Sequence, residues 1–173
     1  LARPREDGAR PSLLDAGCGT GLFFADWLEL GFDPAGMDFA SAEARAGRGP
    51  HGVPVLLGDI CELPAEPRRD VITCIDVLFH VLSDRKWERF LQTACAALAP
   101  QGRLLVQEQL VAEDAWRGVE QHCHFRRASD YARAAAKAGL VLVAHERYAL
   151  PRSGVTEDVL LYARAADLPA RSS

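Results

Sequence analysis

The chain has 173 residues, of which 49% are hydrophobic and 25% charged, and this balance predicts one globular domain with a sizeable core. Its net charge is −4 and its arginines are dispersed among carboxylates, which disfavours nucleic acid as a partner. Five cysteines form no CxxC pair, so we expect a reducing, cytoplasmic compartment and no disulfide scaffold. No apolar run is long enough to span a bilayer, and residues 1–12 do not resemble a signal peptide, so no membrane association is expected.

Short apolar runs that are typical of strands alternate with helical patterns along the chain. Strands are expected at residues 12–17, 34–39, 53–59, 70–78, 102–110, 140–150 and 158–164, with helices at 21–31, 83–102 and 129–140. Ser83 or Asp84 is expected to cap the second helix, and Pro100 and Gly102 to end it. This alternation predicts an α/β fold with βαβ units and an open, mostly parallel sheet.

We expect a single domain over residues 12–165. Residues 1–11 are interpreted as a tail or the remnant of a cap, and residues 166–173 as a C-terminal tail.

Three glycines, Gly17, Gly19 and Gly21, follow the first apolar run in "LLDAGCGTG". Glycines after a buried strand permit close approach of the backbone and a positive φ. The dinucleotide fingerprint is GxGxxG, but here Leu22 occupies the position of its last glycine, and the GK[ST] of a Walker loop is absent. With no lysine or arginine nearby, the loop is predicted to receive a ligand without phosphates.

Two carboxylates follow the next strands. Asp38 closes "AGMD" about 20 residues after the loop, where a carboxylate can accept both hydroxyls of a ribose. Asp59 closes "VLLGD", where it can accept a hydrogen bond from an exocyclic amine such as that of adenine. Either carboxylate could instead cap a helix or form a turn. Together with the glycines, they indicate a nucleoside site at the ends of three successive strands.

At these residues the chain resembles the class I S-adenosylmethionine-dependent methyltransferases. "LLDAGCGTG" is similar to their first motif, "GMDFA" to their second and "LLGDICELP" to their third. "RDVITCIDVLFHVLSD" and "LAPQGRLLVQE" are similar to their fourth and fifth strands with the intervening helix. The resemblance covers about residues 12–163. It implies a Rossmann-like three-layer sandwich whose seven-stranded sheet is mostly parallel, with the last strand antiparallel.

The resemblance also implies which residues bind S-adenosylmethionine and, after transfer, S-adenosylhomocysteine. The glycine loop, with Cys18 inside it and Asp15 ordering it, would contact the methionine moiety. Asp38 would hold the ribose hydroxyls, with Phe39 beside the adenine. Asp59 and the backbone of Ile60 would face the adenine edge. The segment near the methionine amino group would comprise Ile75, Asp76 and Val77.

Histidines are the candidates for a general base, because an acceptor can have to lose a proton during methyl transfer. His124 or His122 is the first candidate; Arg126, next on the same face of an extended segment, is expected to bind an acidic or phenolic substrate. The alternative is an exposed polar loop. His80 follows the fourth strand near the expected methyl donor. Glu108 is expected to orient a histidine or bind substrate.

The two remaining histidines, His51 and His145, are expected to lie on the surface and to be structural, respectively. No metal site is predicted from His122, Cys123, His124 and Glu108, because adjacent residues of an extended segment point in different directions.

The predicted function is transfer of a methyl group from S-adenosylmethionine to oxygen or nitrogen of a small molecule. An RNA methyltransferase is the first alternative, and it would need a basic face built from Arg126, Arg127, Arg133 and Lys137. A non-catalytic module that binds partners is the second. "CIDV" stands where an Asn/Asp-Pro-Pro-aromatic signature would indicate methylation of nucleobases or glutamine. Because only about 12 residues precede the first motif, we expect an open site, a missing lid, or a lid from a partner domain or a homodimer.

Overall fold

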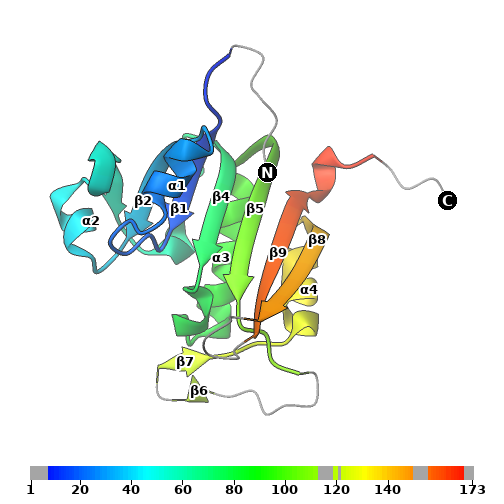
Figure 1. Ribbon diagram of the computed structural model, residues 1–173. Helices are drawn as coiled ribbons and strands as arrows, with labels where there is room; N and C mark the ends of the chain where they lie inside the picture. Colours follow the sequence, from blue (N-terminus) through cyan, green and yellow to red (C-terminus); the bar gives the residue numbers. More distant parts are fainter. Residues whose placement is uncertain (1–7, 113–118, 121, 150–155, 170–173) are drawn as a thin grey trace.

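The computed structural model describes residues 8–112, 119–120, 122–149 and 156–169 (Figure 1). Seven strands form one sheet in the order β3-β2-β1-β4-β5-β9-β8. β9 runs antiparallel to both of its neighbours and the other pairs are parallel, which confirms the predicted sheet. The strands are β1 (Ser12–Ala16), β2 (Asp33–Asp38), β3 (Val55–Leu57), β4 (Arg69–Ile75), β5 (Leu98–Glu108), β8 (Leu140–Ala149) and β9 (Thr156–Arg164).

The central strands are buried on both faces, which explains their consecutive apolar residues. Four residues in a row are buried in β1 and four in β4. Strand order reverses beside β1, since β2 and β3 lie on one side of it and β4 and β5 on the other. In such sheets the crevice for a ligand opens at the carboxyl ends of the strands next to the reversal.

Helices cover the two faces of the sheet unequally. Figure 1 shows α3 and α4 behind the sheet and α1 in front of β1 and β2. The helices are α1 (Phe24–Glu29), α2 (Ala42–Ala46), α3 (Asp84–Ala97) and α4 (Ala128–Lys137). Short 3-10 turns are η1 (Pro50–Gly52), η2 (Ile60–Glu62), η3 (Leu78–His80) and η4 (Ala165–Asp167). A two-stranded ribbon of β6 (Val119–Glu120) and β7 (Cys123–His124) lies outside the main sheet.

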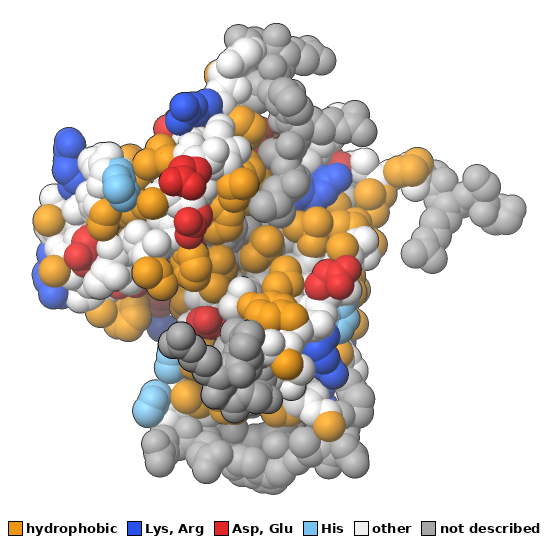
Figure 2. Space-filling view, viewed as in Figure 1, with side chains coloured by type: hydrophobic (Ala, Val, Ile, Leu, Met, Phe, Trp, Pro, Cys, Tyr) orange, Lys and Arg blue, Asp and Glu red, His pale blue; other side chains and the backbone are white. Residues whose placement is uncertain are grey.

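Two hydrophobic cores result. The larger packs one face of β4, β5 and β9 against α3 and α4. The smaller packs single residues of β1, β3 and β4 against Phe24 and Trp27 of α1. On the α1 side of the sheet, the neighbouring β5 and β9 carry Leu105, Val159 and Leu161, which are only half-buried. Hydrophobic side chains are accordingly visible on this face (Figure 2).

Some element boundaries differ from the predicted ones. α1 begins at Phe24 because the preceding residues form turns, and β5 begins at Leu98, directly after α3. Pro100 therefore lies within β5, where the pairing with β4 shifts register and no ladder hydrogen bond is required of it. Ser83 caps α3 as predicted, its Oγ accepting a hydrogen bond from the backbone N–H of Lys86. Within the described ranges, no helix is long and apolar enough to cross a bilayer.

Candidate cofactor and acceptor site

The carboxyl ends of β1, β2, β3 and β4 meet at one edge of the sheet, because these strands are parallel neighbours. This edge gathers the glycine loop after β1, Asp38 at the end of β2, Asp59 beyond β3 and Asp76 beyond β4. The predicted cofactor residues are thus brought together. A separate hollow, lined by residues 8–11 and 30–32, lies at the opposite edge and contains none of them.

The three loop glycines all adopt a positive φ, but they serve different purposes. A Cβ on Gly17 would stand 2.5 Å from a methyl group of Val77, and one on Gly21 would stand 2.5 Å from the ring of Phe24. Nothing lies within 4 Å of the corresponding point on Gly19. Gly17 and Gly21 therefore accommodate the protein's own side chains, and Gly19 alone presents bare backbone to open space.

Phe24 is a residue that the sequence analysis did not single out. It is fully buried, and added Cβ atoms on Gly36 and Gly49 would also stand within 2.7 Å of its ring. Glycines from the loop after β1, from β2 and from the loop before η1 thus surround one aromatic ring, which holds the start of α1 against the glycine loop. Glycine inside the apolar run of β2 was the available signal, since it commonly marks a close approach.

Asp38 ties the glycine loop to the end of β2. Its Oδ2 accepts a hydrogen bond from the backbone N–H of Gly19 at 3.1 Å, and its Oδ1 accepts from the N–H groups of Ala40 and Ser41, both at 2.8 Å. The carboxylate therefore has the turn-forming role that the sequence left open. Each carboxylate oxygen has two lone pairs, so Oδ2 retains capacity for one further donor.

Two exposed hydrophobic side chains flank this edge. Phe39, directly after Asp38, exposes 74% of its surface, and Leu57 at the end of β3 exposes 59%. Large apolar groups at such exposure on neighbouring strand ends provide a surface on which a flat ring can lie.

Asp59 is held by two donors. It accepts a hydrogen bond from the backbone N–H of Cys61 in η2, and it pairs with the Lys86 ammonium at 3.1 Å. Partial burial acts to raise the pKa of Asp59, but these two interactions outweigh it and hold the pKa below its ordinary value. Lys86 was not expected at this site, because it lies 27 residues further along the chain on α3. Ile60, next to Asp59, is buried.

Asp15, near the end of β1, and Cys18, inside the loop, are both buried. Asp15 is buried and accepts a hydrogen bond from the Thr73 hydroxyl of β4 at 2.8 Å. Burial raises the pKa of Asp15 to about 6, although the hydrogen bond from the Thr73 hydroxyl lowers it. Burial likewise raises the pKa of the Cys18 thiol to about 12, so this cysteine remains a neutral thiol. Asp15 therefore connects β1 to β4.

The segment after β4 packs directly on the glycine loop. Ile75 ends the strand, Asp76 adopts a left-handed φ of 56°, and Val77 then contacts Gly17. The Asp76 backbone N–H donates to the carbonyl of Gln107 on β5. Partial burial raises the pKa of the Asp76 carboxyl. After the turn at Asp76, Val77 packs against Gly17, while the Asp76 carboxyl accepts a hydrogen bond from the Gln107 amide of β5 at 3.5 Å.

Glu108 lies behind this crevice at the end of β5. It is 2% exposed, and its Oε1 accepts a hydrogen bond from the backbone N–H of Leu78 in η3 at 2.8 Å. Burial raises the pKa of Glu108 to about 8, and nearby Asp76 raises it further, although the Leu78 N–H lowers it. In the structure, Glu108 therefore anchors η3 as a largely neutral carboxyl group.

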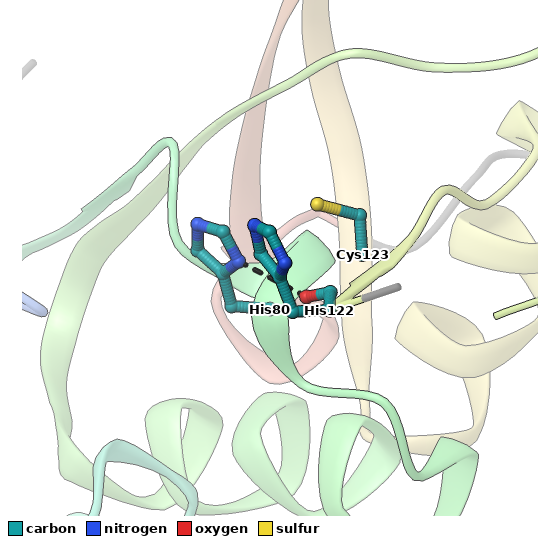
Figure 3. Close-up of side chains that lie close together, drawn as sticks. All are labelled: His80, His122 and Cys123. Atoms are coloured by element: carbon teal, nitrogen blue, oxygen red, sulfur yellow. Dashed lines mark hydrogen bonds between the residues drawn. The ribbon is translucent and has the colours of Figure 1, made fainter. Parts of the chain in front are cut away.

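The three candidate catalytic histidines occupy two environments. His80 and His122 are exposed and their rings stack with centroids 5.7 Å apart, while His80 Nδ1 lies 3.2 Å from the His122 carbonyl (Figure 3). His124 is buried, with its Nδ1 3.0 Å from the carbonyl oxygen of Leu82. His122 lies in a turn and β7 begins only at Cys123, so the strand alternation that would place His122 and His124 on one face does not apply.

Arg126 is buried at 2% exposure, and its guanidinium is surrounded by protein acceptors. It donates to the carbonyl oxygens of Leu78, Val81 and His124 and to the Asp84 carboxylate. It also stacks over the Trp87 ring, 4.5 Å from the centroid. Arg126 thereby fastens the β7 segment to η3 and α3.

The remaining histidines lie away from this edge. His51 is exposed in η1, where it takes a φ of 58°. His145 on β8 pairs with the buried Asp158 at 2.6 Å, which Arg147 also contacts. These positions agree with the expected surface and structural roles.

A sequence profile of the family described as Methyltransferase domain matches residues 1–145. The chain belongs to this family. Among curated proteins, the ubiquinone biosynthesis O-methyltransferase of Methylobacterium nodulans is 36% identical over 99 residues, which cover 53% of this chain and 38% of that protein. The chain therefore spans well under half the length of the curated relative that it matches.

Solved structures share the fold of this methyltransferase domain. The 1,6-didemethyltoxoflavin-N1-methyltransferase of Burkholderia thailandensis, crystallised with 1,6-didemethyltoxoflavin and S-adenosylhomocysteine, has a TM-score of 0.73 at 22% identity, covering 91% of this chain and 72% of that one. The CcbJ methyltransferase of Streptomyces caelestis has a TM-score of 0.70 at 21% identity, covering 91% and 84%. Such similarities establish a class I methyltransferase architecture.

Proposed function

We propose that this domain binds S-adenosylmethionine at the carboxyl edge of β1–β4 and transfers its methyl group to oxygen or nitrogen of a small-molecule acceptor. The observation that carries the proposal is the bare backbone of Gly19 beside the anchored carboxylate of Asp38. Residues 13–24 contain no lysine or arginine. The surface formed by Gly19 and Asp38 therefore suits an amino-acid tail and a nucleoside rather than a phosphate.

Each part of the ligand has a matching group in the site. The remaining lone pair of Asp38 Oδ2 would accept a ribose hydroxyl, and Phe39 would lie against the adenine. Asp59 and the backbone of Ile60 would face the adenine edge, with Lys86 limiting the capacity of that carboxylate. Gly19 and the segment Ile75–Val77 would border the methionine tail.

The cofactor supplies a methyl group on a positively charged sulfur that is open to in-line attack by the acceptor's lone pair. The protein contributes mainly position and exclusion of water, as expected for a displacement of this kind. Where the acceptor must lose a proton, the exposed imidazoles of His80 and His122 are in place to exchange it with solvent. His124 is buried against Leu82, which supports a structural role for it instead.

The charged groups favour a small molecule over RNA as the acceptor. The basic face that RNA would need includes Arg126, which is buried, Arg133, which pairs with Asp130, and Lys137, which pairs with Glu88. Cations neutralised in this way leave little positive potential for a phosphate backbone. The small-molecule enzymes named by the sequence and structural relatives give independent support.

The test offers methyl-labelled S-adenosylmethionine to the protein together with either a low-mass metabolite extract or protein-free RNA. We expect label in the low-mass fraction, and we expect Asp38→Ala to abolish or strongly reduce it. Label in the RNA would replace this proposal with the RNA alternative. No transfer by a protein that binds S-adenosylhomocysteine would instead support a binding module.

A further inference from the structure

His80, at the end of η3, lies close to His122 and to Cys123, which begins β7. One possible ligand atom from each residue lies within 4.8 Å of the others, and Figure 3 shows the two imidazole rings side by side with the Cys123 sulfur turned toward them. We propose that these residues, the His–His–Cys cluster, bind a divalent transition-metal ion of the zinc class. The proposal rests on donor geometry and does not require methyl transfer, although it uses the two imidazoles that are proposed above to exchange a proton.

The donor set selects the class of ion. Two imidazoles and one thiolate are ligands of Zn²⁺ and related borderline ions, whereas Mg²⁺ and Ca²⁺ prefer the oxygen ligands that this cluster lacks. Three protein ligands leave a fourth tetrahedral position for water or an acceptor atom. Binding replaces the thiol proton of Cys123 with the metal, so one proton is released for each ion bound.

The distances require only a small adjustment. Bonds of about 2.0–2.3 Å to zinc place tetrahedral ligand atoms about 3.3–3.8 Å apart, so donor atoms that are up to 4.8 Å apart must close by up to about 1–1.5 Å. Both histidines are exposed and Cys123 is half-buried, so small side-chain rotations achieve this. A turn before β7 puts His122 and Cys123 on one side, contrary to the expectation that adjacent residues would diverge.

The two segments that carry the cluster are already fixed together, although they lie 42 residues apart. Next to the cluster, the rings of Phe79 and Phe125 stack with centroids 5.5 Å apart. On the buried side, Arg126 donates to the carbonyl oxygens of η3 and the following loop. A site whose ligands are held before the metal arrives loses less conformational entropy on binding.

The contact between His80 and His122 also determines which nitrogen of His80 can bind a metal. His80 Nδ1 lies 3.2 Å from the His122 carbonyl, so donation of its N–H to that oxygen leaves the Nε2 lone pair for a metal. Histidines that bind metals commonly donate their other N–H to a carbonyl or carboxylate in this way. The same lone pair cannot serve as a general base while an ion is bound.

The test uses untagged protein, treated with chelator and dialysed, to which Co²⁺ is added as a spectroscopic substitute for Zn²⁺. We expect one Co²⁺ per chain and a thiolate-to-cobalt charge-transfer band in the near ultraviolet. Cys123→Ser removes the band, and His80→Ala weakens binding by more than the about 10–100-fold that loss of an outer-shell partner costs. Cys95→Ser, at the other half-buried thiol, and His51→Ala serve as matched controls that retain wild-type binding.

Calorimetric binding of S-adenosylhomocysteine by the same samples separates this proposal from the proposed function. Wild-type protein that binds S-adenosylhomocysteine but gives no cobalt–thiolate band overturns the metal site alone. A band that survives Cys123→Ser also overturns it. A metal-dependent band without S-adenosylhomocysteine binding supports the metal site and contradicts the proposed function.

Discussion

The carboxylate of Asp38 accepts a hydrogen bond from the backbone N–H of Gly19 at 3.1 Å, which joins the end of β2 to the glycine loop of β1. Two further backbone N–H groups donate to the same carboxylate. Asp38 is therefore both the brace of the loop and the group proposed to receive the ribose. Because Asp38 has both roles, the conformation of the glycine loop depends on the residue that is proposed to bind the ligand.

Asp38→Ala is expected to weaken S-adenosylhomocysteine binding by about 5- to 150-fold, or about 1–3 kcal/mol, because the ribose and the loop lose one acceptor. Isothermal titration calorimetry measures the change. Asp33→Ala, at the exposed opposite end of β2, is the matched control and should bind normally. An unchanged dissociation constant for Asp38→Ala would remove this residue from the site.

Gly19→Ala should impair cofactor binding more than folding. Gly19 and Gly47 both have a positive φ and open space at the Cβ position, so alanine at either should cost about 1–2 kcal/mol of stability. Only at Gly19 would the new methyl group enter the proposed ligand space. Urea unfolding combined with calorimetry should show similar stability losses but a binding defect in Gly19→Ala alone.

Gly21→Ala is expected to do the opposite. Its Cβ would stand 2.5 Å from the buried ring of Phe24, so the fold itself must shift. We expect a larger loss of unfolding free energy than for Gly47→Ala, measured in urea under the same conditions. Equal stability of the two variants would show that the ring of Phe24 moves aside freely.

The buried carboxyl of Glu108 predicts a specific pH dependence. Its pKa is about 8 in the folded chain and 4.5 when unperturbed, so the folded state keeps a proton that the unfolded state releases between these values. Stability is therefore lost as pH rises through this window. Relative to Glu108→Gln, the wild type should lose about 3–5 kcal/mol of unfolding free energy from pH 4.5 to pH 8. Parallel curves for the two proteins would show that Glu108 ionises normally.

Arg126→Ala should destabilise the protein by about 2–4 kcal/mol, because buried carbonyl oxygens lose a charged donor. Arg133→Ala, on an exposed side chain that pairs with Asp130, should cost less than about 1 kcal/mol. Urea denaturation gives both values. If Arg126→Ala kept wild-type stability but lost acceptor binding, the original assignment of Arg126 to substrate would be restored.

The sheet could be predicted because each of its central strands has a recognisable pattern in its own residues. Consecutive apolar residues in β1 and β4 indicate burial on both faces, and the glycine cluster marks the turn after β1. Asp38 and Asp59 could likewise be placed at strand ends, since strands and their ends follow from the chain order. The groups that donate to these two carboxylates within the protein, the Gly19 N–H and the Lys86 ammonium, could not be predicted from the chain order.

The missed features depend on contacts between distant segments. Lys86 reaches Asp59 across 27 residues, and Arg126 reaches Leu78 across 48. The approach of His80 to His122 depends on β7, whose two residues carry no strand pattern of their own. The periodicity of one sequence contains no information on such pairings. The contacts on the acceptor side were therefore harder to predict than those on the cofactor side.

The most direct measurement of the central claim is calorimetric titration of the wild-type protein with S-adenosylhomocysteine. The proposed cradle at Gly19 and Asp38 predicts saturable binding at one site per chain. Absence of heat and of any shift in unfolding temperature at millimolar ligand would contradict it.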